Sequence, residues 1–115
     1  MKETNELVKI IVEAAEERKA ENCVVLNMEQ LTPITDRYVI CHGNNERQVQ
    51  AIARSIKNAV EENGLDIQRM EGFEQARWIL IDAKDVVCHV FHKDERTYYN
   101  LEKLWGDADV VGDNK

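Results

Sequence analysis

The sequence lacks the features that mark membrane-spanning, secreted or low-complexity proteins. Its 115 residues include one proline and five glycines, and contain no repeat or biased segment, so we expect a single ordinary folded domain. There is no apolar run long enough to cross a bilayer, and no basic segment followed by an apolar one at the start. A charged helical pattern follows Met1 directly, which favours a cytoplasmic protein without membrane contact.

Cysteine is too scarce for a disulfide framework. The three cysteines, Cys23, Cys41 and Cys88, cannot all pair with one another, and none stands in a Cys-x-x-Cys spacing. Each lies in or beside a β-type run, which indicates buried free thiols. Cys41-His42 and Cys88-His89 supply metal-ligand types, but neighbours on a strand point to opposite faces. We therefore expect no metal and no other cofactor.

Basic side chains are in deficit. The chain has 15 Lys and Arg against 22 Asp and Glu, a net charge of −7. Nucleic-acid backbones are bound largely through clustered lysine and arginine, so the balance argues against direct DNA binding. It suits a basic protein partner, whose approach an acidic surface would steer. The simpler reading is that the charge only keeps the protein soluble.

The hydrophobic pattern predicts the order α-β-β-α-β-β-β-α, a mixed sheet flanked by helices of the α/β (α+β) class. The expected helices cover 5–20, the segment from Asn45 to Gly64, and 93–105; the expected strands cover 23–28, 37–41, 65–70 and two runs within 78–91. Asn45 is a good N-cap that Gln48 would complete, which explains the Gly43 corner without a phosphate site. We expect one domain over 1–107 and an acidic flexible tail over 108–115.

The stretch WILIDAKDVVCHVF, residues 78–91, carries the candidate functional residues. If Ala83-Lys84 is a two-residue turn, Asp82 lies opposite Asp85 and Trp78 opposite His89. One face of this hairpin is then wholly apolar and should pack on the helices: Ile79, Ile81, Val86 and Cys88. The other face is amphipathic and could meet a partner: Trp78, Leu80, Asp82, Asp85, Val87 and His89. Opposed like charges cost stability, and a basic group on a partner would explain their tolerance.

More than one chemistry is compatible with the amphipathic face. Asp82 and Asp85 could act as acid and base or hold a cation, but aspartates that flank a turn are often only turn-formers. The sequence fixes no histidine or nucleophile beside them, so we assign no catalytic residue. Trp78 is a core residue by default, yet tryptophan is also a frequent anchor of protein interfaces.

Four blocks in a specific order and spacing carry a resemblance to a known family: ITDRYVICHGNNERQVQAIA (34–53), EG (71–72), WILIDAKDVVCHVF (78–91) and RTYYNLEKLW (96–105). In these blocks the sequence resembles the Iojap-like ribosomal silencing factors. The resemblance implies a protein with a nucleotidyltransferase-like fold but without enzymatic activity. It implies binding to the large ribosomal subunit at ribosomal protein L14, which blocks joining of the small subunit and represses translation, notably under nutrient limitation.

The resemblance also implies a homodimer, as in many family members, and a contact face that includes Trp78, Asp82, Asp85 and His89. The sequence departs from the family pattern at Lys84, where many members have glycine, so the shape of the turn stays open. The corner at 42–45 reads His-Gly-Asn-Asn, where the family usually has small Thr and Ser residues. Cys88 stands where valine is common.

Two other functions remain open at the level of sequence. A nucleotidyltransferase-like enzyme would need a Gly-Ser corner and an Asp-x-Asp pair on a strand, whereas the only such pair, 107–109, lies in the expected tail. An adaptor for ribosome assembly would use the same hairpin face at a different time.

Overall fold

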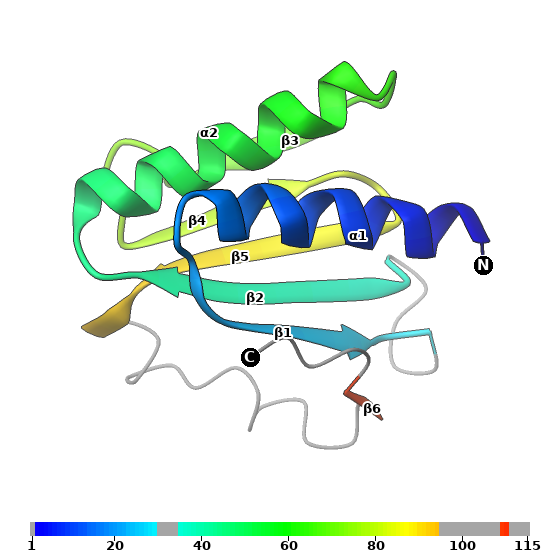
Figure 1. The fold of residues 1–115 in the computed structure, drawn as a ribbon, viewed down its shortest axis with the longest axis horizontal. Helices are drawn as coiled ribbons and strands as arrows, with labels where there is room; N and C mark the ends of the chain where they lie inside the picture. The colour runs from blue at the N-terminus through cyan, green and yellow to red at the C-terminus, as the bar shows by residue number, and fades with distance from the viewer. Residues whose placement is uncertain (1, 30–34, 95–108, 111–115) are drawn as a thin grey trace.

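A computed structural model describes residues 2–29, 35–94 and 109–110. Its elements are α1 (Lys2–Glu17), β1 (Glu21–Asn27), β2 (Arg37–Gly43), α2 (Glu46–Glu62), β3 (Arg69–Glu71), β4 (Trp78–Asp82), β5 (Val86–His92) and β6 (Asp109–Val110). The strands form one sheet in the order β3-β4-β5-β2-β1-β6, in which only β2 and β5 are parallel neighbours. The expected fold class, a mixed sheet with flanking helices, is confirmed (Figure 1).

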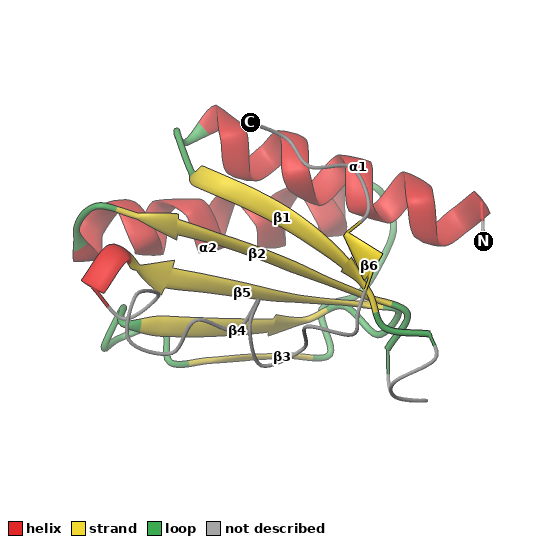
Figure 2. Cartoon of the chain, turned by 90° about the horizontal axis from the view of Figure 1, so that it is seen from below, coloured by secondary structure: helices red, strands yellow, loops and turns green. Residues whose placement is uncertain are grey.

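Both long helices lie on the same face of the sheet (Figures 1 and 2). Their apolar sides pack on the inward side chains of β1, β2, β4 and β5 to form the larger of two cores. This core contains the whole apolar face predicted for the hairpin, each side chain 0% exposed: Ile79, Ile81, Val86 and Cys88. The helices therefore leave the opposite face of the sheet to other contacts.

The ends of α2 follow from its sequence. The Asn45 side chain accepts a hydrogen bond from the Gln48 backbone N–H at 2.8 Å, and Gln48 Oε1 accepts one from the Asn44 N–H at 2.7 Å. These are the donors that a phosphate would need, so the corner is a helix cap. At the other end, Gly64 adopts a φ of 79°. The Leu65 N–H returns to a carbonyl of the last helical turns, as in a Schellman motif.

Several predicted boundaries differ from the structure. The first helix begins and ends three residues earlier than predicted, and the third strand is the short β3 rather than 65–70. The helix predicted over 93–105 lies almost entirely outside the described residues. Within the expected flexible tail, Asp109–Val110 forms β6 and pairs with β1. The domain boundary at 107 and the flexible tail over 108–115 remain predictions.

Candidate protein-docking site

The hairpin of β4 and β5 turns one residue later than predicted. The Ala83 N–H donates to the Val86 carbonyl at 2.9 Å, so the two turn residues are Lys84 and Asp85. The observed register pairs Trp78 with Phe91, Leu80 with His89, and Asp82 with Val87. The predicted pairing was therefore wrong by two residues. A slip of two keeps every strand residue on its predicted face, because side chains alternate with a period of two.

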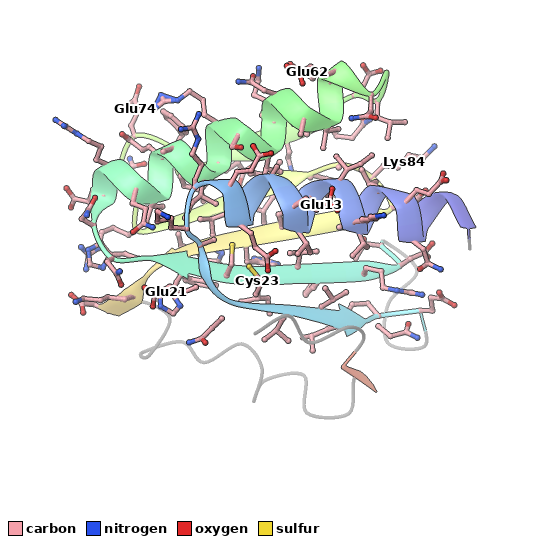
Figure 3. The ribbon with its side chains drawn as sticks, viewed as in Figure 1. Glu13, Glu21, Cys23, Glu62, Glu74 and Lys84 are labelled. Atoms are coloured by element: carbon pink, nitrogen blue, oxygen red, sulfur yellow. The ribbon has the colours of Figure 1, made fainter. Side chains whose placement is uncertain are left out.

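The backbone at Lys84 explains the error. Lys84 has a φ of 76°, in the left-handed region that favours glycine. The turn is held by Asp82 Oδ1, which accepts a hydrogen bond from the Lys84 N–H at 2.9 Å. Lys84 lies at the end of the hairpin, near the first turns of α1 (Figure 3). A glycine at this position would have indicated the turn, whereas lysine gives no such signal.

Asp85 does not face Asp82 across the strands, which corrects the predicted pair of opposed carboxylates. Asp85 is exposed in the turn, and its backbone carbonyl accepts hydrogen bonds from Thr35 Oγ1 at 2.8 Å and from the Asp36 N–H at 3.0 Å. The Asp82 carboxylate instead lies 3.7 Å from Arg69 Nε on β3. The tolerance of like charges therefore needs no partner to explain it, and Asp82 acts in part as a turn-former.

The sheet face turned away from the helices carries a cluster of aromatic rings. Trp78 stacks on Phe91 with ring centroids 5.0 Å apart, and Tyr38 meets His89 edge-on at 4.7 Å. The second, smaller core lies on this face: Leu26, Met28, Ile40 and Phe91, with Val24, Tyr38 and Trp78 partly buried against it. Aromatic and apolar surface is thus partly exposed on the face that the two long helices do not cover.

The six predicted contact residues differ in exposure. Trp78, Leu80 and Asp82 are partly exposed and Asp85 is fully exposed. Val87 and His89 are buried, with 7% and 3% of their surface exposed. The strand residues share one face, as the alternation predicted, but the buried pair can only support the others from within the domain.

The ring of His89 is neutral at physiological pH. Trp78 Nε1 donates a hydrogen bond to His89 Nδ1 at 3.0 Å, so that nitrogen carries no proton. Burial lowers the pKa of His89 to about 4. On the same face, burial raises the pKa of the Tyr38 hydroxyl. The aromatic centre of this face at Tyr38 and His89 is therefore uncharged, and the Asp82 carboxylate lies toward the turn.

The described residues give little support to the other chemistries considered. Within 2–29, 35–94 and 109–110, no group of three His, Cys, Asp or Glu side chains is arranged to hold a metal ion. All three cysteines are buried thiols outside any disulfide, as predicted. Burial, and then the charge of Asp82, raises the pKa of the Cys88 thiol. In the described part of the chain, no helix combines the length and apolarity needed to cross a membrane.

Gly72 is a site residue whose physical role the sequence did not reveal. Its φ is 81°, and a Cβ built on it would lie only 2.3 Å from the Trp78 carbonyl oxygen. The backbone that carries Trp78 thus passes directly against Gly72. In the sequence, the block EG at 71–72 carries only the family resemblance. Tyr38 and Phe91 were also missed as members of the site, although strand alternation would have placed Phe91 on the face of His89.

The sheet with two helices on one face and a partly exposed aromatic surface on the other defines a small α/β domain whose second sheet face the two long helices do not cover. All 115 residues match the family described as "Ribosomal silencing factor during starvation" (RsfS), residues 1–115. The chain belongs to this family of ribosomal silencing factors, and the resemblance stated from the sequence is confirmed.

Relatives agree with this assignment along most of the chain. A protein of Halalkalibacterium halodurans named ribosomal silencing factor RsfS is 59% identical over 106 residues, covering 92% of this chain and 91% of its own. The chloroplastic protein Iojap of Zea mays is 30% identical over 101 residues, covering 88% of this chain and 44% of that protein. A crystal structure from Bacillus halodurans superposes with a TM-score of 0.85 at 55% identity, covering 94% of this chain and 98% of that one.

Proposed function

We propose that this protein is a translational silencer of the cytoplasm that binds the large ribosomal subunit at ribosomal protein L14. Once bound, it prevents the small subunit from joining by occupying the same surface, which represses translation, notably under nutrient limitation. Exclusion of this kind needs no catalytic turnover, so the proposed role is not enzymatic. The observation that carries the proposal is the partly exposed Trp78 on the sheet face that α1 and α2 leave uncovered.

The proposed docking face combines apolar groups, which would anchor the partner, with charged groups, which would pair with it. Trp78 and Leu80 supply the apolar anchors, because large side chains in a desolvated patch carry most of the energy of an interface. Asp82 and Asp85 lie at one end and would pair with Lys or Arg of a basic ribosomal protein. Asp82 must then exchange its contact with Arg69, whose side chain is 58% exposed. Exposed ion pairs contribute roughly 0–1 kcal/mol, so we expect the apolar anchors to dominate.

Replacement of the anchor tests the proposal. We expect Trp78→Glu to abolish co-sedimentation with isolated large subunits, because a carboxylate would be buried against the partner without compensation. The matched control is Phe73→Glu, which also places a carboxylate at a partly buried aromatic position. Phe73 contacts α2 through Arg54, whose guanidinium lies 5.3 Å from its ring centroid, so this variant alters the helix side.

The two variants have distinct expected outcomes. Trp78→Glu should keep the circular dichroism spectrum of the parent and lose binding to large subunits. Phe73→Glu, if its spectrum shows that it is folded, should retain binding. Addition of the parent protein to large subunits should block joining with small subunits, and Trp78→Glu should not. Normal sedimentation of Trp78→Glu with large subunits would show that the docking face lies elsewhere. A homodimer formed through this face would compete with docking, so the occupancy of large subunits would rise less steeply than the total protein concentration.

A further inference from the structure

The sequence placed His89 among the residues that touch the partner, but the side chain is only 3% exposed. Its Nδ1 accepts the hydrogen bond from the indole N–H of the partly exposed Trp78 at 3.0 Å. We propose that His89 is a positioning residue: it fixes the orientation in which the Trp78 indole docks and does not itself touch the partner. This inference rests on the proposed function, because it concerns how the same face is prepared for binding.

The hydrogen bond selects one of two orientations of the indole. Trp78 pairs with Phe91 across the hairpin, so His89 is its diagonal neighbour on the same face. Stacking on Phe91, with an interplanar angle of 28°, restrains the plane of the indole. It does not distinguish the two orientations related by a half-turn about χ2, which place the six-membered ring on opposite sides. Only one of them directs Nε1 at His89, and a side chain already held in its bound orientation loses less entropy on binding.

The same bond requires a neutral imidazole. A protonated histidine donates from both nitrogens, so Nδ1 could no longer accept from the indole. Among the described residues, the titratable or charged groups that face His89 are Tyr38 and His42 on β2 and Asp82 on β4. Beyond β4, Arg69 lies next to Asp82 and Glu71 next to Leu80 on β3. His42 Nε2 lies 3.5 Å from a Glu21 carboxylate oxygen. Burial nevertheless dominates and keeps the pKa of His89 near 4.

A double-mutant cycle separates positioning from contact. The four proteins are the parent, His89→Leu, Trp78→Phe and the double variant, each titrated against isolated large subunits. We expect His89→Leu to weaken binding about 3- to 10-fold, the usual effect of losing one hydrogen bond. In the Trp78→Phe background the same change should have no effect, because phenylalanine has no N–H to position. His89→Asn places an amide oxygen near the position of Nδ1 and should restore part of the affinity.

A spectroscopic measurement on the free protein supplements the cycle. In a Trp105→Phe background, Trp78 is the only tryptophan, and its indole N–H gives a single NMR signal. We expect this signal to be protected from exchange at pH 7, and to lose protection in His89→Leu and in the parent as the pH falls toward 4. If His89→Leu does not fold, His89→Phe takes its place in the cycle, because its side chain also lacks a hydrogen-bond acceptor.

The outcomes separate the inference from the proposed function. Equal weakening by His89→Leu in both backgrounds would mean that His89 acts independently of Trp78, which overturns the inference. Parent-like binding of His89→Leu, with Trp78→Glu inactive, would also overturn it while leaving the docking face intact. Failure of the parent itself to bind large subunits would overturn the proposed function, and the inference with it.

Discussion

Replacement of Gly72 by alanine tests whether the backbone of β4 is held in place from outside the sheet. Gly72 and Gly64 have nearly the same positive φ, 81° and 79°. An alanine Cβ at Gly64 would meet nothing within 4 Å, whereas at Gly72 it would lie 2.3 Å from the Trp78 carbonyl oxygen. Both substitutions therefore place an alanine at a positive φ, and only the one at Gly72 adds a collision.

The expected magnitudes follow from this difference. Alanine in the left-handed region costs about 1–2 kcal/mol, and the loss of glycine from the unfolded chain returns about 0.4–1 kcal/mol. Gly64→Ala should thus destabilise the protein by roughly 1 kcal/mol. For Gly72→Ala the neighbouring strand must also move, because real Cβ atoms essentially never approach closer than 3.0 Å. Such overpacking adds about 1–3 kcal/mol, for a total of about 2–4 kcal/mol.

Urea denaturation monitored by circular dichroism measures both variants. With a slope of about 1–3 kcal/mol per molar urea for a small domain, the midpoint of Gly72→Ala should fall by about 1 M or more, clearly further than that of Gly64→Ala. The indole signal of Trp78 should shift in Gly72→Ala and stay in place in Gly64→Ala. Equal midpoints for the two variants would show that Gly72 is required only for its φ, and that its approach to Trp78 does not constrain the strand.

Three further predictions concern the hairpin. The pKa of His89 is about 4 in the folded state against roughly 6.5 in the unfolded state, so the free energy of unfolding is highest above pH 6.5 and falls by about 3 kcal/mol toward pH 4. Urea midpoints should fall over this pH range in the parent and in Trp78→Phe. If the parent and His89→Asn lose stability equally over this range, the assignment to His89 is contradicted. Lys84→Gly should raise the melting temperature measured by calorimetry by a few degrees. Relief of the left-handed strain stabilises the folded state, and it exceeds the stabilisation of the unfolded chain by glycine entropy by up to about 1 kcal/mol. A lower melting temperature would contradict the assigned turn. Asp85→Lys should slow association with large subunits, and the effect should shrink as salt is added. Glu62→Lys makes an equal change of charge on α2 (Figure 3) and should leave the association rate unchanged. Equal association rates for the two variants would exclude a local role for Asp85.

The face of the hairpin was predictable although its register was not. Assignment of a strand residue to a face depends only on whether its position is odd or even, and the true register differs from the predicted one by two. Ile79 and Cys88 were therefore placed correctly in the core, and Trp78 and His89 on the other face. The pairing failed because Lys84 adopts a positive φ that a lysine does not indicate. The turn also bonds to a segment distant in sequence, since the Asp85 carbonyl accepts hydrogen bonds from Thr35 and Asp36.

Exposure was the property that the sequence could not supply. Alternation states which way a side chain points, but burial depends on how many neighbours the rest of the fold brings to it. Leu80 and His89 are directly opposed in the hairpin and share a face, yet Leu80 is partly exposed and His89 is buried. The neighbouring strands differ: β5 lies between β4 and the seven-residue β2, whereas the other neighbour of β4 is the edge strand β3, which spans only Arg69–Glu71.

This difference in exposure gives the face two kinds of residue that mutagenesis must distinguish. A change at His89 or Val87 alters the packing of the domain, so any loss of binding should be accompanied by a loss of stability. A change at Leu80 or Asp85 removes surface that is at least partly exposed, and should weaken binding while leaving the free energy of unfolding nearly unchanged. Trp78 belongs to both groups, because its indole is partly exposed and also stacks on Phe91. Its substitutions should therefore be compared with the parent only after binding has been corrected for the fraction of folded protein.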